Sequence, residues 1–200
     1  MSVHIRAAAL ALIVAVPYPV ASGQGTAALP APVLLDTTGL FQDRYARVGS
    51  DFFIGGQPTE RALRELKAQG VTVVVNLRMP QEMQRVPFDE AALVKSLGMT
   101  YVHLPMRGTD EAPYAPDAVT KFAEAVRNAN GKVLLHCTVA WRASHLWAAY
   151  LIKEKGVADE EALANARAIN LMDDHRMTQR GTQPVEDFLG RKPKGLRTPG

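Results

Sequence analysis

The run Val71-Thr72-Val73-Val74-Val75-Asn76-Leu77-Arg78 restricts the fold of this chain more than any other stretch. It is β-branched almost throughout and apolar at successive positions, so both of its faces need to be buried. A strand of this kind lies at the centre of a parallel sheet that helices cover on both sides. The run therefore predicts an α/β architecture.

Strands and helices alternate along the chain around this run. Glycine and proline separate apolar stretches of strand length from stretches with helical spacing. This alternation predicts a single three-layer α/β domain with a mainly parallel central sheet flanked by helices. The predicted strands are 47–54, 71–78, 99–104 and 133–135, and the predicted helices are 58–69, 89–97, 116–127, 143–152 and 159–171.

The two ends of the chain differ in composition from the predicted domain, which we expect over residues 42–172. Residues 1–23 combine a modestly positive start, an apolar run of ten residues and a small-residue cleavage site, which is the pattern of an export signal. Residues 24–41 are rich in small residues and proline and predict a linker. Residues 173–200 form a basic tail that we expect to be partly ordered. The sequence thus predicts an exported, periplasmic protein.

Composition argues against several classes of partner. The net charge of +3 comes from scattered Lys and Arg residues, and aromatic residues make up only 6% of the chain, so nucleic-acid binding is not expected. The apolar run in residues 1–23 is too short to span a bilayer, so we expect no stable membrane insertion after signal removal. No group of residues has metal-ligand spacing, and the sequence implies no cofactor.

The only cysteine of the chain, Cys137, begins a short loop between the predicted strand 133–135 and the predicted helix 143–152. Backbone N–H groups at a helix N-terminus lack intrahelical acceptors and favour an anion in front of them. These groups, with Arg142 close by, stabilise a thiolate and favour Cys137 as a nucleophile. Since a lone cysteine cannot form an intrachain disulfide, its position indicates chemistry rather than cross-linking.

Two stretches carry a resemblance to a known family. His136-Cys137, a short loop and Arg142 at a helix start resemble the signature of the cysteine-dependent protein tyrosine and dual-specificity phosphatases. The segment 53–59, of sequence Phe-Ile-Gly-Gly-Gln-Pro-Thr, with the helix and strand that follow it, resembles the opening of a bacterial phosphatase-like group associated with β-lactamase-fold hydrolases. In that group four residues separate Cys and Arg, as here. The resemblance covers residues 47–152 and implies a cysteine phosphatase-like fold.

The resemblance also implies a reaction, the hydrolysis of a phosphate monoester on a protein or small molecule through a phosphocysteine intermediate. Cys137 would attack phosphorus, and Arg142 with the loop amides would hold the equatorial oxygens. The general acid is expected to be Asp110, 27 residues before the cysteine, with Glu111 and Asp117 as competitors. We expect the substrate to contact residues in and around the loop, namely His136, Thr138, Val139, Ala140, Trp141, Ser144 and Arg78.

Some residues of the loop keep other functions open. Ala140 stands where related loops have glycine, which predicts a backbone angle that costs energy for other residues. Ala143 stands where the family has a hydroxyl residue. The four-residue spacing also suits a rhodanese-like sulfurtransferase with a Cys137 persulfide, and the two alanines suit a phosphate-binding module without turnover. For His136, a role in organising the loop and a place as a satisfied core residue both remain open, whereas His103 is expected to be structural.

Overall fold

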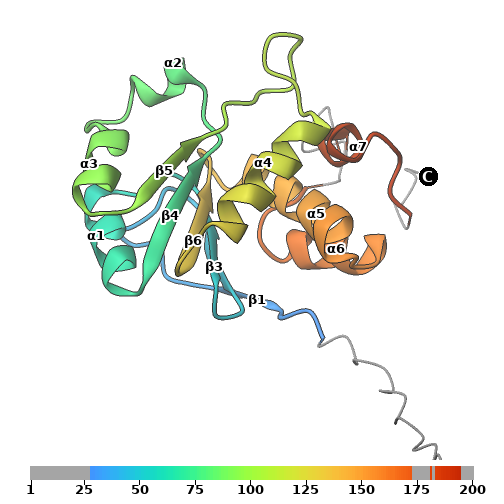
Figure 1. The fold of residues 1–200 in the computed structure, drawn as a ribbon, viewed down its shortest axis with the longest axis horizontal. Coiled ribbons are helices and arrows are strands. Elements are labelled where there is room, and N and C mark those ends of the chain that lie inside the picture. The colour runs from blue at the N-terminus through green and yellow to red at the C-terminus, as the bar shows by residue number, and fades with distance from the viewer. Residues whose placement is uncertain (1–27, 173–180, 182, 195–200) are drawn as a thin grey trace, which may run out of the picture.

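The chain folds around one six-stranded sheet (Figure 1). The computed structural model describes residues 28–172, 181 and 183–194. The strand order is β1-β2-β3-β6-β4-β5, in which β3, β6, β4 and β5 run parallel and β1 and β2 form an antiparallel edge. The strands are β1 (Pro32–Leu34), β2 (Tyr45–Val48), β3 (Phe52–Gly55), β4 (Val71–Asn76), β5 (Thr100–His103) and β6 (Lys132–His136).

Helices cover both faces of the sheet. Figure 1 shows α1 and α3 on one side and α4, α5, α6 and α7 on the other, so the predicted three-layer α/β domain with a mainly parallel sheet is confirmed. The helices are α1 (Glu60–Ala68), α2 (Pro80–Met83), α3 (Glu90–Ser96), α4 (Pro116–Arg127), α5 (Trp141–Lys155), α6 (Asp159–Arg167) and α7 (Gln183–Leu189).

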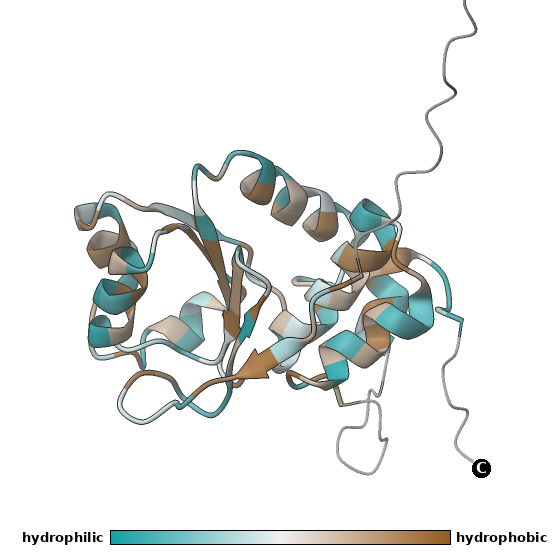
Figure 2. Cartoon of the chain, turned by 90° about the horizontal axis from the view of Figure 1, so that it is seen from below, coloured by the Kyte–Doolittle hydropathy of each residue, from teal (hydrophilic) through white to brown (hydrophobic). Residues whose placement is uncertain are grey.

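Residues of β4 contribute to both cores. Val73 and Val75 pack into the core under α4 and α5, whereas Val71 and Val74 pack into the core under α1 and α3. All four are at most 4% exposed, as expected for a strand between two helix layers. Figure 2 shows the hydrophobic colouring along the central strands and the hydrophilic colouring on outward-facing parts of the helices.

Local signals set the ends of several helices. Pro116 opens α4 at its first turn, as predicted. Asp89 caps α3 by accepting a hydrogen bond from the backbone N–H of Ala92. Helix α1 begins later than predicted, because Thr59 is its N-cap and accepts from the backbone N–H of Ala62 at 3.2 Å. Pro58 therefore precedes the helix instead of lying in its first turn.

The N-terminal part of the domain differs most from the sequence prediction. The predicted strand 47–54 is an antiparallel hairpin, because Gly49, with φ of 59°, turns the chain between β2 and β3. The segment 24–41 is not simply a linker. Its residues 32–34 form β1, which pairs with β2, and Phe41 is buried against α1 and β3.

The C-terminal part continues the fold beyond the predicted domain end at residue 172. Val185 and Phe188 of α7 are fully buried in the core with α4 and α5. Arg191 forms an ion pair with Asp159 at the start of α6, at 2.6 Å. The predicted export signal lies outside the described residues. Within the described ranges, no helix is both long and apolar enough to cross a membrane.

Candidate active site

The candidate site lies where the parallel strands end. The chain leaves β4 into α2, leaves β5 into the loop 105–115, and leaves β6 at Cys137, all at the upper end of the sheet in Figure 1. Cys137 is 1% exposed, and its backbone N–H donates to the carbonyl of Gly55 on the neighbouring strand at 3.2 Å. Residues 137–142, here called the signature loop, lead from this point into the first turn of α5.

Ala140 gives the signature loop its sharp bend. Its φ of 65° is left-handed, which confirms the backbone angle that its alignment with glycine in related loops predicted. The Ala140 carbonyl accepts hydrogen bonds from the backbone N–H of Ser144 at 2.9 Å and from the Ser144 hydroxyl at 2.8 Å. The bend places the free N–H groups of the first turn of α5 beside the loop.

The segment 55–57 supports the signature loop from behind. A Cβ on Gly56 would lie 1.8 Å from the carbonyl oxygen of Gln42 and 2.8 Å from that of Thr138, so only glycine fits. The backbone N–H of Gln57 donates to the Thr138 carbonyl at 3.0 Å. The two stretches that carry the family resemblance are therefore in direct contact.

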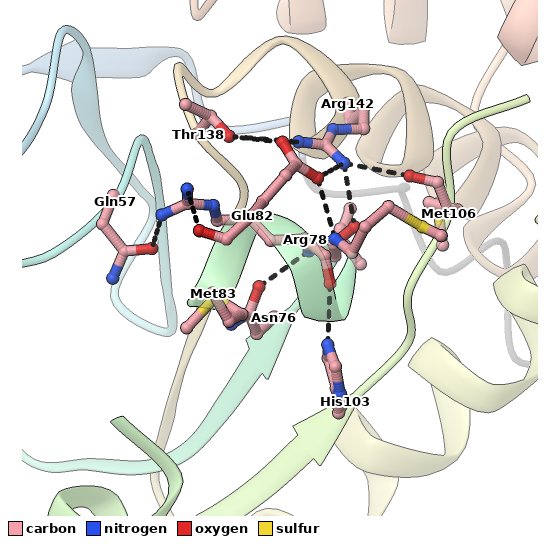
Figure 3. A network of polar contacts seen from close by, with 11 residues as sticks. Gln57, Asn76, Arg78, Glu82, Met83, His103, Met106, Thr138 and Arg142 are labelled. Atoms are coloured by element: carbon pink, nitrogen blue, oxygen red, sulfur yellow. Dashed lines mark hydrogen bonds and ion pairs between the residues drawn. The ribbon is translucent and has the colours of Figure 1, made fainter. Parts of the chain in front are cut away.

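The Arg142 guanidinium is held by a carboxylate from α2 (Figure 3). Its Nη1 and Nη2 donate to the two oxygens of Glu82 at 2.8 and 2.7 Å, a bidentate pair. Nη1 also donates to the carbonyls of Leu77 and Met106, and Nη2 to the hydroxyl of Thr138 at 3.1 Å. The Thr138 hydroxyl in turn donates to Glu82 at 3.0 Å. Five hydrogen bonds thus fix the guanidinium before any ligand is bound.

The Glu82 carboxyl is ionised over the whole physiological range. Burial raises its pKa, but the hydrogen bonds from Arg142 and from the backbone N–H of Met79 lower it by more. The resulting pKa of Glu82 is about 2. For Arg142, burial lowers the pKa, and Glu82 together with the nearby Cys137 sulfur raises it by more. The Arg142 guanidinium is therefore a permanent cation next to Cys137.

A second guanidinium, that of Arg78, lies on the other side of Glu82 (Figure 3). Its Nη1 donates to the side-chain oxygen of Gln57 at 2.6 Å and its Nη2 to the backbone carbonyl of Glu82 at 2.9 Å. Arg78 is 6% exposed. Burial lowers its pKa, an effect that the charges of Glu82 and Cys137 oppose. The predicted binding residue Arg78 thus lies within electrostatic range of the nucleophile.

His136 belongs to a buried polar network below the loop. Its Nε2–H donates to Glu90 at 2.9 Å, and both side chains are fully buried. Glu90 also accepts from Gln57 and from Asn76, at 2.5 and 3.0 Å. Burial raises the Glu90 pKa, and His136 with these donors lowers it by more. Because His136 is fully buried, it supports the base of the loop and offers no surface to a substrate.

The three acidic candidates for proton donation lie away from this network. Asp110 is exposed in the loop 105–115 and lines a cavity of about 660 Å³ that also borders α7. Glu111 is exposed, and a hydrogen bond from its own backbone lowers its pKa. Asp117 pairs with Lys121 at 2.8 Å, which lowers the Asp117 pKa. In the described residues, none of the three contacts the signature loop through a hydrogen bond.

The remaining predicted residues divide into supporting and accessible ones. Ser144 is fully buried and bonded to Ala140, so it stabilises the bend and is not available to a substrate. Thr138, Val139 and Trp141 are partly exposed on the loop. The Val139 carbonyl accepts from Asn170, and the Trp141 ring lies 4.2 Å from that of His145. His103, expected to be structural, donates to the Arg78 carbonyl at 2.7 Å.

Sequence reasoning missed three residues of the site, namely Glu82, Gln57 and Glu90. Gln57 lies in the segment 53–59 that carries the family resemblance, and this motif was the signal that could have identified it as a site residue. Glu90 follows a helix-capping aspartate, and its only signal was its place in the first turn of the predicted helix 89–97. Glu82 stands in a polar stretch after Pro80, and its 60-residue separation from Arg142 hides the pairing.

A family model and a curated relative both match this chain. A family model described as "DSP-PTPase phosphatase fused to NAD+ kinase" matches residues 40–184. A curated relative, the beta-lactamase hydrolase-like protein of Xylella fastidiosa (strain 9a5c), is 28% identical over 132 residues, which are 64% of this chain. The match spans only 30% of that relative's length.

Solved structures of cysteine phosphatase fold resemble the whole domain. A DUF442 protein of Shewanella putrefaciens CN-32, named as a candidate phosphatase, has a TM-score of 0.54 at 27% identity, covering 75% of this chain and 94% of that one. PTPMT1 in complex with PI(5)P gives 0.58 at 18% identity, covering 73% and 92%. P. aeruginosa TpbA in complex with pTyr gives 0.54 at 18% identity, covering 86% and 96%.

Proposed function

We propose that this chain, which belongs to the family of DSP-PTPase phosphatases described as fused to NAD+ kinase, hydrolyses phosphate monoesters with Cys137 as its nucleophile. The chain is a phosphatase of the tyrosine and dual-specificity type by that membership. The single observation that carries the assignment of residues is the signature loop. It joins the end of β6 to the start of α5 and brings the Cys137 sulfur within electrostatic range of the Arg142 guanidinium.

The reaction would proceed in two displacements. In the first, the Cys137 thiolate attacks phosphorus, an S–P bond forms, and the bond from phosphorus to the leaving oxygen breaks. A general acid gives its proton to that oxygen. In the second, the conjugate base of that acid takes a proton from the water that attacks the phosphocysteine, the S–P bond breaks, and inorganic phosphate leaves with the thiolate restored. The N–H groups of the loop and Arg142 hold the equatorial oxygens throughout.

Arg142 enters this reaction already oriented. Because both of its terminal nitrogens donate to Glu82, a phosphate bound in a bidentate manner would use the Nε–H and the Nη2 N–H that now donates to Thr138. Thr138 would help in the exchange, since its hydroxyl already bridges Arg142 and Glu82. Glu82 itself is unsuited to the role of acid, because its pKa of about 2 leaves it without a proton at neutral pH.

Asp110 remains our proposed general acid. It follows β5 on a loop whose end, Met106, accepts a hydrogen bond from Arg142, so the loop is tied to the site at its base. Since Asp110 is exposed, its role as the acid requires the tip of the loop to move toward Cys137 when substrate binds. Asp117 is held by Lys121 on α4, which makes it the weaker candidate.

The substrate is proposed to be a phosphorylated protein or small molecule. Two relatives of the same fold are known in complex with phosphorylated compounds, PI(5)P and pTyr. We also propose that the protein acts in the periplasm, on the strength of the sequence pattern in residues 1–23.

The direct test is a comparison of two activities of the purified protein. We expect hydrolysis of an aryl phosphate, inhibited by vanadate, and no sulfur transfer from thiosulfate to cyanide. Sulfur transfer without phosphate release would instead favour the rhodanese-like alternative, and tight phosphate binding without either activity would favour the binding module.

A further inference from the structure

We infer that a cavity beside the signature loop binds a second anionic group, carried by the leaving group of the substrate. This inference rests on the proposed phosphatase reaction and specifies its substrate class. The cavity has a volume of about 790 Å³ and extends from Thr138 and Arg78 to the segment 85–88 that follows α2. Thr138 belongs both to the signature loop and to the cavity wall. A substrate whose phosphate lies at the loop can therefore extend its leaving group into the cavity.

Arg78 is the centre of this second site. Its guanidinium is buried, and its two hydrogen-bond acceptors are neutral oxygens, the Gln57 amide and the Glu82 backbone carbonyl. Its Nε has no hydrogen-bond partner among the described residues. A buried donor without a partner and a buried guanidinium with no carboxylate hydrogen-bonded to it both carry a free-energy cost that a bound anion reduces.

The carboxylates near Arg78 are engaged elsewhere. The side chain of Glu82 is taken by Arg142, and that of Glu90 accepts from His136, Gln57 and Asn76. Figure 3 shows the two guanidinium groups of Arg78 and Arg142 separated by Glu82. The structure therefore offers two anion positions, with Arg142 for the phosphate that is cleaved and Arg78 for a second group.

The rest of the cavity wall supports this assignment. Arg61 and Arg85 add two cations, and the one carboxylate among the described lining residues is Glu60. Arg85 is exposed and forms no ion pair within the described part of the chain, whereas Arg61 pairs with Glu65 at 2.7 Å. Excess positive charge in a concave site raises the local concentration of anions.

Apolar side chains complete the cavity. Phe41, Pro58, Val86, Pro87 and Phe88 line it together with the cations. Such a wall accommodates the apolar body of a ligand, and the cations fix its charged end. The preferred substrate is therefore a phosphate monoester whose leaving group combines an apolar body with a carboxylate or a second phosphate.

The test compares substrates that differ only in charge. The esters 3-carboxyphenyl phosphate and 3-carbamoylphenyl phosphate have the same shape. The first carries a carboxylate at the position where the second carries an amide. We expect kcat/KM to be roughly tenfold higher for the carboxylate, from one or more charge-assisted hydrogen bonds. A third substrate, 1,3-phenylene bisphosphate, corrected for its two equivalent phosphates, shows whether phosphate is preferred over carboxylate. The advantage should shrink as salt is added, because part of the wall is solvated.

Arg85→Gln provides the matched variant, because an exposed residue can be replaced without loss of the fold. It should reduce the carboxylate-to-amide ratio by about threefold or more. Arg127→Gln, the same change at an exposed residue of α4 paired with Glu154, should leave the ratio as it is. A ratio near one in the wild-type protein, with the amide substrate still hydrolysed, would overturn the second site and leave the phosphatase reaction standing. Failure to hydrolyse any of the three esters would overturn both.

Discussion

Arg142 donates to Glu82 through both terminal nitrogens, so an incoming phosphate meets a guanidinium that is already in place. The cysteine, the arginine and the bend at Ala140 could be inferred from sequence, because they lie within six residues of one another and follow a motif. The hydrogen-bond partners of these residues could not be inferred from sequence. Glu82 comes from α2 and Glu90 from the start of α3, and only folding brings their carboxyls to Arg142 and His136.

Glu82 should stabilise the folded protein in a pH-dependent way. Its pKa falls from 4.5 in the unfolded chain to about 2 in the fold, so the stabilisation is complete above about pH 4.5 and is lost as the pH falls toward 2. The whole shift corresponds to about 3 kcal/mol, and because the pair is partly solvated we expect about 1–2 kcal/mol. Glu82→Gln should therefore unfold at lower urea than wild type at pH 7, with a smaller difference at pH 3.

A solvated carboxylate provides the control for this measurement. Glu124→Gln, on the exposed side of α4, should change stability by less than about 0.5 kcal/mol at either pH. A Glu82→Gln difference that is constant from pH 7 to pH 3 would show that the charge of Glu82 is not what stabilises the fold.

Asp110→Asn tests the assignment of the general acid. A good leaving group needs little protonation, so the variant should lose about 100-fold or more in kcat for phenyl phosphate and much less for 4-nitrophenyl phosphate. Asp117→Asn, at the start of α4, serves as the comparison and should slow both substrates little. Equal losses on the two substrates in Asp110→Asn would remove Asp110 from this role.

At the scale of elements, the parallel strands and most of the helices could be predicted, and the antiparallel strands near the N-terminus could not. β4, α3 and α4 have clear patterns and clear ends, such as the capping Asp89 and the opening Pro116. The hairpin of β2 and β3 was wrongly predicted as one strand, although the polar stretch Gly49-Ser50-Asp51 between them is a turn signal. β1 spans three residues and is defined by pairing with β2, which local sequence does not encode.

The buried pair of Glu90 and His136 ties α3 to β6, and its loss should be costly. Both side chains are fully buried, so removal of Glu90 leaves the His136 Nε2 without its acceptor. Glu90→Ala should reduce the free energy of unfolding by about 3–5 kcal/mol. Glu65→Ala, which removes an exposed carboxylate paired with Arg61, should cost less than about 1 kcal/mol. Similar urea midpoints for the two variants would contradict a structural role for the buried pair.

At the scale of the molecule, distant stretches of the chain meet at one end of the sheet. The segment 55–57 contacts the signature loop, which lies some 80 residues later in the sequence. Both stretches carry the family resemblance, and this resemblance correctly implied the fold. The C-terminal contribution was foreseen less well, because the apolar residues of α7 are few and lie in a basic, proline-containing region.

The export signal predicted for residues 1–23 is tested on the native protein. We expect a periplasmic protein whose N-terminus lies between Ser22 and Gln24, because a small-residue site follows the apolar run. Intact-mass analysis of the protein from the periplasmic fraction measures this directly. A mass that corresponds to all 200 residues would contradict cleavage.

In the proposed reaction the Cys137 sulfur is the atom that receives the phosphoryl group. Rapid acid quench during turnover of an aryl phosphate, followed by peptide mass analysis, measures this intermediate directly. We predict a peptide containing Cys137 that carries one phosphoryl group in the wild-type protein and none in Cys137→Ser, which should lose turnover while it still binds phosphate through Arg142 and the loop amides. Turnover without a phosphorylated Cys137 peptide, or undiminished turnover in Cys137→Ser, would contradict the account.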